Sequence, residues 1–137
     1  MYPTGGWYHA RKYAVEALSD ALRVEVAPFG ISVVLVEPGL IRTEFESVAA
    51  GGLASGDPAG PYAALRRHSE EVTRRGYASR LGADPAAVAD VVKHAVEAAR
   101  PRTRYVVTPA AKAQVQLRRF GGDRLWDAVM RRTYRIG

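Results

Sequence analysis

Residues 31–43 read ISVVLVEPGLIRT, and this stretch decides the fold of the chain. Its first part, Ile31 to Val36, is a short apolar run rich in β-branched side chains, which is typical of a buried strand in a parallel sheet. The following Glu37-Pro38-Gly39 breaks the strand into a turn. Because open α/β sheets bind ligands at the carboxyl ends of their strands, we expect this turn to border a binding site.

A helix is predicted before this strand, from about Trp7 to Ala27, with Pro28 and Gly30 ending it. It places Tyr8 and Lys12 four residues apart on one face, with Cβ atoms about 5–6 Å apart. At an effective dielectric of about 20, a charged lysine attracts a phenolate about 6 Å away by roughly 2.8 kcal/mol. Such a pair is suited to moving a proton onto or off an alcohol oxygen. The spacing alone is a weak signal, since an aromatic residue beside a solvated lysine is common.

A second helix and strand repeat the α/β pattern. Asp84 is a candidate N-cap with Pro85 in the first turn, an apolar face follows, and Arg100-Pro101 ends the helix. Tyr105 to Thr108 is predicted to be a short strand closed by a proline. Because a helix followed by a strand continues a βαβ unit, we expect this strand to lie parallel to and beside Val33 to Val36.

The connection between these units has a different composition. Ser47 to Pro61 is rich in Gly, Ala and Ser, which predicts a mobile segment. Tyr62 to Tyr77 carries a charged run and is interpreted as a solvated helix over the binding site. A disordered connector is the alternative interpretation.

Most of the positive charge lies in the tail. The net charge is +6, and the segment from Ala111 onward contains seven basic and two acidic residues. Asp123 is a candidate cap for an amphipathic helix whose apolar side carries Leu125 and Trp126, so residues 111–137 are predicted to form a basic amphipathic helical tail. We favour its packing over the site or on a partner subunit; contact with an anionic membrane surface is the weaker alternative, because a short helix buries limited area in lipid. No nucleic-acid module is present, so nucleic-acid binding is not expected.

Composition excludes several classes of site. There is no cysteine, so disulfides, thiol nucleophiles and thiolate metal sites are absent. His9, His68 and His94 lie far apart without metal-ligand spacing, and no metal is expected. The first residues do not resemble a signal peptide and no run of eighteen apolar residues occurs, which agrees with a cytoplasmic enzyme.

A helix with Tyr-x-x-x-Lys, a strand and then Pro-Gly-x-Ile-x-Thr occur in the order seen in the short-chain dehydrogenase/reductase family, and the chain resembles the carboxyl-terminal half of that family. The resemblance implies an α/β fold with a partial Rossmann-like, doubly wound parallel sheet. It comprises the last two strands with flanking helices and lacks the amino-terminal dinucleotide-binding half. Residues 1–110 would form this half-domain, with a substrate loop at about 44–83, and residues 111–137 the tail.

The resemblance also implies an activity. An enzyme of this family transfers a hydride between a small-molecule carbonyl or alcohol and NAD or NADP. Tyr8 would be the catalytic acid/base, and Lys12 would hold the nicotinamide ribose. The residues that would border the nicotinamide are Pro38, Gly39, Ile41 and Thr43, with the Ile41 backbone and the Thr43 hydroxyl near its carboxamide or the pyrophosphate.

Parts of the family pattern are absent from this sequence. The family's Gly-rich phosphate turn, its Asn-Ala-Gly stretch and its catalytic Ser precede the tyrosine, whereas seven residues precede Tyr8 here. We therefore expect the chain as given to be a truncated form that is weakly active or inactive and does not bind a dinucleotide tightly.

The alternative function is a non-catalytic remnant that acts as a dimerisation or interaction module. An unpaired apolar strand edge motivates it. So does a stripe of small residues on the first helix, which suits a homo-oligomer contact and close intramolecular packing equally well: Ala10, Ala14, Ala17 and Ala21.

Overall fold

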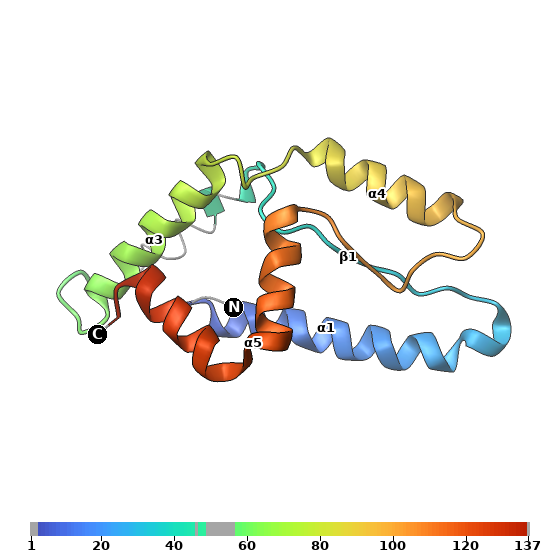
Figure 1. Ribbon diagram of the computed structural model, residues 1–137, viewed down its shortest axis with the longest axis horizontal. Coiled ribbons are helices and arrows are strands. Elements are labelled where there is room, and N and C mark those ends of the chain that lie inside the picture. The colour runs from blue at the N-terminus through green and yellow to red at the C-terminus, as the bar shows by residue number, and fades with distance from the viewer. Residues whose placement is uncertain (1–2, 46, 49–56, 137) are drawn as a thin grey trace.

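The computed structural model describes residues 3–45, 47–48 and 57–136. The elements along these ranges are α1 (Gly6–Glu25), the 3-10 helix η1 (Ala27–Phe29), β1 (Leu35–Glu37), α3 (Ala63–Ala78), α4 (Pro85–Glu97), β2 (Arg104–Val106) and α5 (Pro109–Tyr134). β1 and β2 pair in parallel, with Leu35 opposite Arg104 and Glu37 opposite Val106. The fold is therefore mostly helical α/β with a small parallel two-stranded sheet (Figure 1), and the predicted parallel pairing is confirmed.

The two strands lie between α1 and α4 (Figure 1), and alternate side chains of β2 reach the two helices. Arg104 donates through Nη2 to both carboxylate oxygens of Asp20 on α1, at 2.9 and 2.8 Å. The next residue, Tyr105, meets the His94 ring of α4 edge-on, with ring centroids 5.9 Å apart. Because successive side chains of a strand point to opposite faces, α1 and α4 lie on opposite faces of the sheet.

Both strands are shorter than the sequence predicts, and β1 is also less buried; β2 covers Arg104–Val106 where Tyr105 to Thr108 is expected. β1 covers Leu35–Glu37 where Ile31 to Val36 is expected, and Ile31 is 56% exposed, so the prediction of a fully buried strand is wrong. The physical reason is the number of neighbours, because β1 has one strand partner within the described ranges. In a parallel ladder of this register, the backbone groups of Leu35 and Glu37 form the hydrogen bonds to β2. The Val36 N–H and C=O groups point to the other side of β1, where no strand is paired within the described ranges.

α1 has nearly the predicted bounds, and its surface is open to solvent. It ends at Glu25, and Gly30 in the left-handed conformation, with φ of 70°, closes the following η1. No residue of α1 is buried, and Leu18 is 70% exposed. Neither its apolar side chains Val15, Leu18 and Leu22 nor its alanine stripe is covered, since a sheet of two strands offers this helix few neighbours.

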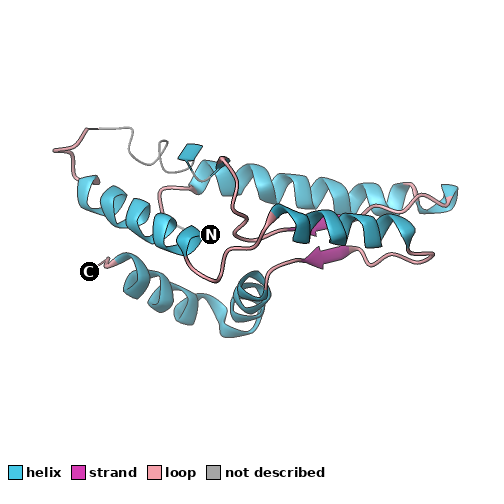
Figure 2. Ribbon diagram, turned by 90° about the horizontal axis from the view of Figure 1, so that it is seen from above, coloured by secondary structure: helices cyan, strands magenta, loops and turns pink. Residues whose placement is uncertain are grey.

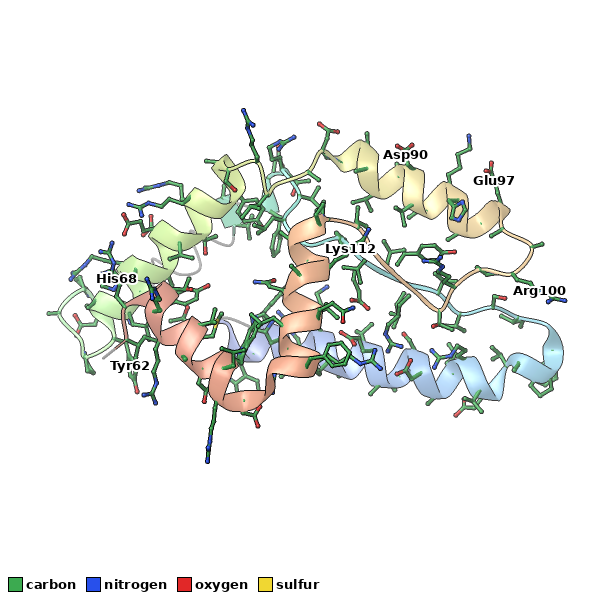
Figure 3. All side chains as sticks on the ribbon, viewed as in Figure 1. Tyr62, His68, Asp90, Glu97, Arg100 and Lys112 are labelled. Atoms are coloured by element: carbon green, nitrogen blue, oxygen red, sulfur yellow. The ribbon has the colours of Figure 1, made fainter. Side chains whose placement is uncertain are left out.

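α4 begins as predicted. The Asp84 carboxylate accepts a hydrogen bond from the Ala86 N–H at 3.0 Å, and Pro85 occupies the first helical position. The helix ends at Glu97, before the predicted Arg100. The side chains of Asp90 and Glu97 point away from the strands (Figure 3).

α3 confirms the helical interpretation of residues 62–77, and the disordered connector is the wrong alternative. This helix is not fully solvated, because it packs against α5. Three aromatic side chains on these two helices are buried, Tyr77 on α3 and Trp126 and Tyr134 on α5, each 7% exposed. Most of the predicted mobile segment, Ser47 to Pro61, lies outside the described residues.

α5 starts earlier than the helix predicted after Asp123. It begins at Pro109, where the Thr108 hydroxyl accepts a hydrogen bond from the Ala111 N–H at 3.2 Å, and bends at Gly122, with φ of 67° and ψ of −179°. The view from above shows its two parts running in different directions (Figure 2). Asp123 pairs with Arg118 at 2.6 Å. Within the described ranges, no helix is both long enough and apolar enough to cross a membrane.

Candidate functional site

The structure brings Tyr8 and Lys12 together on the first turns of α1. Tyr8 is half-buried and Lys12 is exposed. The Lys12 Nζ lies over the Tyr8 ring, 5.5 Å from its centroid, which is within the range of a cation–π contact. The geometric part of the prediction, that these two side chains share one helix face, therefore agrees with the structure.

Two aromatic rings also contact Tyr8. The His9 imidazole meets the Tyr8 ring edge-on, with centroids 5.5 Å apart. Burial lowers the pKa of His9. The Phe45 ring lies on Tyr8 at a tilt of 37°, with centroids 6.0 Å apart. The sequence reasoning missed Phe45; its position two residues after Thr43, at the start of the expected substrate loop, was the available signal.

Pro38 and Gly39 lie where β1 ends and contact the start of α5. Gly39 has a φ of 83°, a conformation that favours glycine. A Cβ on Gly39 would lie 2.9 Å from the Ala111 Cβ and closer still to the Thr108 hydroxyl. The Thr108 N–H donates to the Pro38 carbonyl at 3.3 Å. The turn is therefore pressed against the first turn of α5, and glycine is required by space as well as by conformation.

Ile41 lies in a short parallel bridge to Ala83 beyond the turn. The Arg42 N–H donates to the Ala83 carbonyl and the Ala83 N–H to the Leu40 carbonyl, each at 2.9 Å. In this pattern the backbone N–H and C=O groups of Ile41 point away from Ala83. Within the described part of the chain, neither group has a backbone partner.

Thr43 connects this segment to Tyr8. Its Oγ1 accepts a hydrogen bond from the Phe45 N–H at 3.3 Å, and the Phe45 ring contacts Tyr8. The predicted site residues thus fall into two groups. Thr43, Tyr8 and Lys12 are linked through Phe45, whereas Pro38 and Gly39 are held against α5.

Glu37, just before the Pro38-Gly39 turn, has a raised pKa. Burial raises the pKa of Glu37, the negative charge of Glu16 raises it further, and Arg104 opposes both from 3.5 Å away. The same arginine lowers the pKa of Asp20 through its hydrogen bonds, with a smaller contribution from Arg23. This network was not predicted, because the periodicity of a sequence does not reveal which charges meet across a sheet.

The three histidines lie in three different places. His68 is on α3 near the last turns of α5 (Figure 3), His94 packs on Tyr105, and His9 packs on Tyr8. Among the residues that the structure describes, no group of three or more His, Asp or Glu side chains is arranged to hold a metal ion.

Comparison with known proteins gives consistent matches. The family model described as short chain dehydrogenase matches residues 1–51. The chain is 37% identical over 128 residues to the uncharacterized oxidoreductase YbbO of Escherichia coli K12, a match that covers 93% of this chain and 42% of YbbO. It is also 37% identical over 110 residues to an NADPH-dependent 3-dehydrocapnine reductase of Ornithobacterium rhinotracheale, covering 78% of this chain and 37% of the reductase.

A mammalian relative extends the range of similar proteins. Retinol dehydrogenase 16 of Rattus norvegicus is 35% identical over 112 residues, which cover 74% of this chain and 34% of the dehydrogenase. The chain thus spans 42% or less of the length of these curated relatives. Bacterial and mammalian oxidoreductases match along most of the chain, and the family model matches the segment that holds Tyr8, Lys12 and the Pro38-Gly39 turn. It follows that the chain belongs to the short-chain dehydrogenase/reductase family.

Proposed function

We propose that this chain provides the proton-transfer part of an NAD- or NADP-dependent oxidoreductase that interconverts a small-molecule alcohol and the corresponding carbonyl compound. The observation that supports this most directly is the contact of the Lys12 ammonium with the Tyr8 ring, 5.5 Å from its centroid. A phenol beside a fixed cation is suited to exchanging a proton with a substrate oxygen. One relative is itself named as NADPH-dependent.

The residues present fit the nicotinamide end of such a cofactor. Lys12 is exposed, and within the described ranges no carboxylate lies at ion-pair distance from it, so its ammonium has N–H groups available for ribose hydroxyls. The Ile41 backbone N–H and the Thr43 hydroxyl are further polar groups for the carboxamide or the pyrophosphate. When bound, the nicotinamide supplies the hydride for the carbonyl carbon, or accepts it in the reverse direction.

The protein side chains handle the proton. In the reducing direction the Tyr8 hydroxyl donates its proton to the substrate oxygen, and in the oxidising direction the Tyr8 oxygen accepts it. The positive charge of Lys12 stabilises the negative charge that develops on the Tyr8 oxygen. Tyr8 is the catalytic residue in this scheme, and Lys12 both holds the cofactor and supports Tyr8.

The test replaces the matched 128-residue segment of YbbO by this chain and measures NADH- and NADPH-dependent turnover with a panel of aldehydes, ketones and alcohols. Tyr8→Phe is expected to lower kcat roughly 100- to 10,000-fold while cofactor affinity changes little. Tyr13→Phe, on the same helix but 53% exposed, is the matched control and should retain turnover. Lys12→Ala is expected to weaken both turnover and cofactor binding. Full turnover by Tyr8→Phe would refute the proposed role of Tyr8.

For the chain alone we expect weak cofactor binding, because its sequence contains no Gly-x-x-x-Gly-x-Gly turn to hold the pyrophosphate. The measurement is a fluorescence titration of the chain with NADH and NADPH. Saturable binding at micromolar concentration would contradict this expectation.

A second candidate function, a dimerisation module, is favoured by the open face of α1. Three apolar side chains on this helix are uncovered: Val15 is 52%, Leu18 70% and Leu22 46% exposed. Size-exclusion chromatography with light scattering should then show a homo-oligomer that Leu18→Glu dissociates. Val96→Glu, at a 79% exposed position on α4, is the control and should leave it intact. A wild-type chain that is monomeric and does not associate with added YbbO would count against the dimerisation function.

A further inference from the structure

Phe45 is a half-exposed aromatic residue in contact with Tyr8. The two ring centroids are 6.0 Å apart, within the range of about 4.5–7 Å at which aromatic pairs touch. Phe45 is nevertheless 45% exposed. An apolar surface next to the proposed acid/base is therefore open to solvent.

Local hydrogen bonds fix the backbone on both sides of Phe45. Its N–H donates to Thr43 Oγ1 at 3.3 Å. The N–H groups of Ser47 and Val48 both donate to the Glu44 carbonyl, at 3.1 and 3.3 Å. These bonds form a helical turn just after the Pro38-Gly39 segment, so the same stretch of backbone positions both Thr43 and the Phe45 ring.

Two polar side chains also lie against the Tyr8 ring. Lys12 presents an ammonium and His9 an imidazole, and Phe45 presents a hydrocarbon ring. A substrate whose oxygen lies at the Tyr8 hydroxyl has its remaining atoms beside these neighbours. An apolar substituent gains from leaving water where it can contact Phe45, and not where it meets the charged Lys12.

We propose that Phe45 is a substrate-contacting residue and gives the site a preference for alcohols and carbonyl compounds that carry an aromatic or other planar apolar group. This inference rests on the proposed role of Tyr8, because that role brings the substrate oxygen to the Tyr8 hydroxyl. It predicts that the Phe45 ring discriminates between a benzylic alcohol and a short aliphatic one.

The test is a fluorine NMR titration of the full chain with 4-fluorobenzyl alcohol, and with 2-fluoroethanol as the small probe. We expect saturable binding of 4-fluorobenzyl alcohol that Phe45→Ala weakens roughly fivefold or more, the effect of losing one aromatic contact. Phe45→Leu keeps an apolar side chain without a ring, so its affinity for 4-fluorobenzyl alcohol should lie between those of the wild type and Phe45→Ala. Phe120→Ala, which removes a 78% exposed phenylalanine on α5, is the matched control and should bind like the wild type.

Equal affinity of the wild type and Phe45→Ala for 4-fluorobenzyl alcohol would overturn the proposal, as would the absence of saturable binding by the wild type. Circular dichroism melts show whether each variant is folded, and Phe45→Leu decides the question if Phe45→Ala is not. The two proposals fail separately. Tyr8→Phe retains the ring and removes the same hydroxyl contact from both probes, so it should leave the ratio of the 4-fluorobenzyl alcohol and 2-fluoroethanol affinities within about twofold, whereas Phe45→Ala should lower that ratio. Turnover of Tyr8→Phe in the YbbO chimera tests the acid/base role.

Discussion

Arg104 on β2 donates through a single guanidinium nitrogen to both carboxylate oxygens of Asp20 on α1, at 2.9 and 2.8 Å. Two further carboxylates surround the same side chain, Glu16 at 3.9 Å and Glu37 at 3.5 Å. Arg104 therefore connects the helix that carries Tyr8 and Lys12 to the strand pair and to the residue before the Pro38-Gly39 turn.

The connection between Arg104 and Asp20 predicts a specific acid sensitivity. Hydrogen bonds from Arg104, and then from Arg23, hold the pKa of Asp20 below its usual value. A carboxyl with a lowered folded-state pKa adds stability above its unfolded-state pKa of about 4, and this contribution is lost as the pH falls through the folded-state pKa. We expect Asp20→Asn to lower Tm at pH 7 and to flatten the fall of Tm between about pH 5 and about pH 2.

Circular dichroism melts across this pH range measure the effect. Asp123→Asn is the control, because the Asp123 side chain is 82% exposed in its pair with Arg118 and should contribute little. Parallel pH profiles for the wild type and Asp20→Asn would show that the hydrogen bonds to Arg104 do not stabilise the fold.

Gly39→Ala should destabilise the protein by roughly 1–3 kcal/mol from backbone strain, with crowding against α5 adding to this. Gly39 has a φ of 83°, and an added Cβ would lie 2.9 Å from the Ala111 Cβ. Gly30→Ala separates the two causes, since Gly30 has a φ of 70° and an added Cβ there meets nothing within 4 Å. Urea unfolding should show Gly39→Ala to be the less stable of the two variants. Equal losses of unfolding free energy at both sites would mean that α5 moves to accommodate the added methyl group.

The two tryptophans provide a matched pair for the α3–α5 contact. Trp126 is 7% exposed on α5, which packs against α3, whereas Trp7 is 88% exposed on α1. Trp126→Ala should cost about 3–5 kcal/mol of unfolding free energy, and Trp7→Ala less than about 0.5 kcal/mol. Urea unfolding followed by circular dichroism measures both. A small loss for Trp126→Ala would mean that α3 and α5 are stabilised by something other than this side chain.

Local signals in the sequence predicted the features that depend on near neighbours. Asp84 and Pro85 start α4 because a cap needs only the next few residues. Tyr8 and Lys12 meet because helical spacing places them on one face. The parallel pairing of β1 and β2 followed from the handedness and order of α/β units.

Features that depend on distant neighbours were not predictable in this way. The apolar run at Ile31 indicates burial, but its exposure is set by how many strands lie beside it. Phe45 reads as an ordinary apolar residue until the fold brings it to Tyr8. The contact of Gly39 with α5 joins positions far apart in the chain, and a glycine in a turn does not identify what approaches it.

The bend in α5 has a consequence for how the carboxyl-terminal segment is oriented. Gly122 combines a φ of 67° with a ψ of −179°, a pair of torsions that is essentially restricted to glycine. The helix therefore consists of two helical segments that meet at this residue. The direction of the second segment relative to the first is encoded by the backbone torsions of this single residue, so a residue with a side chain at this position would be strained in the observed direction.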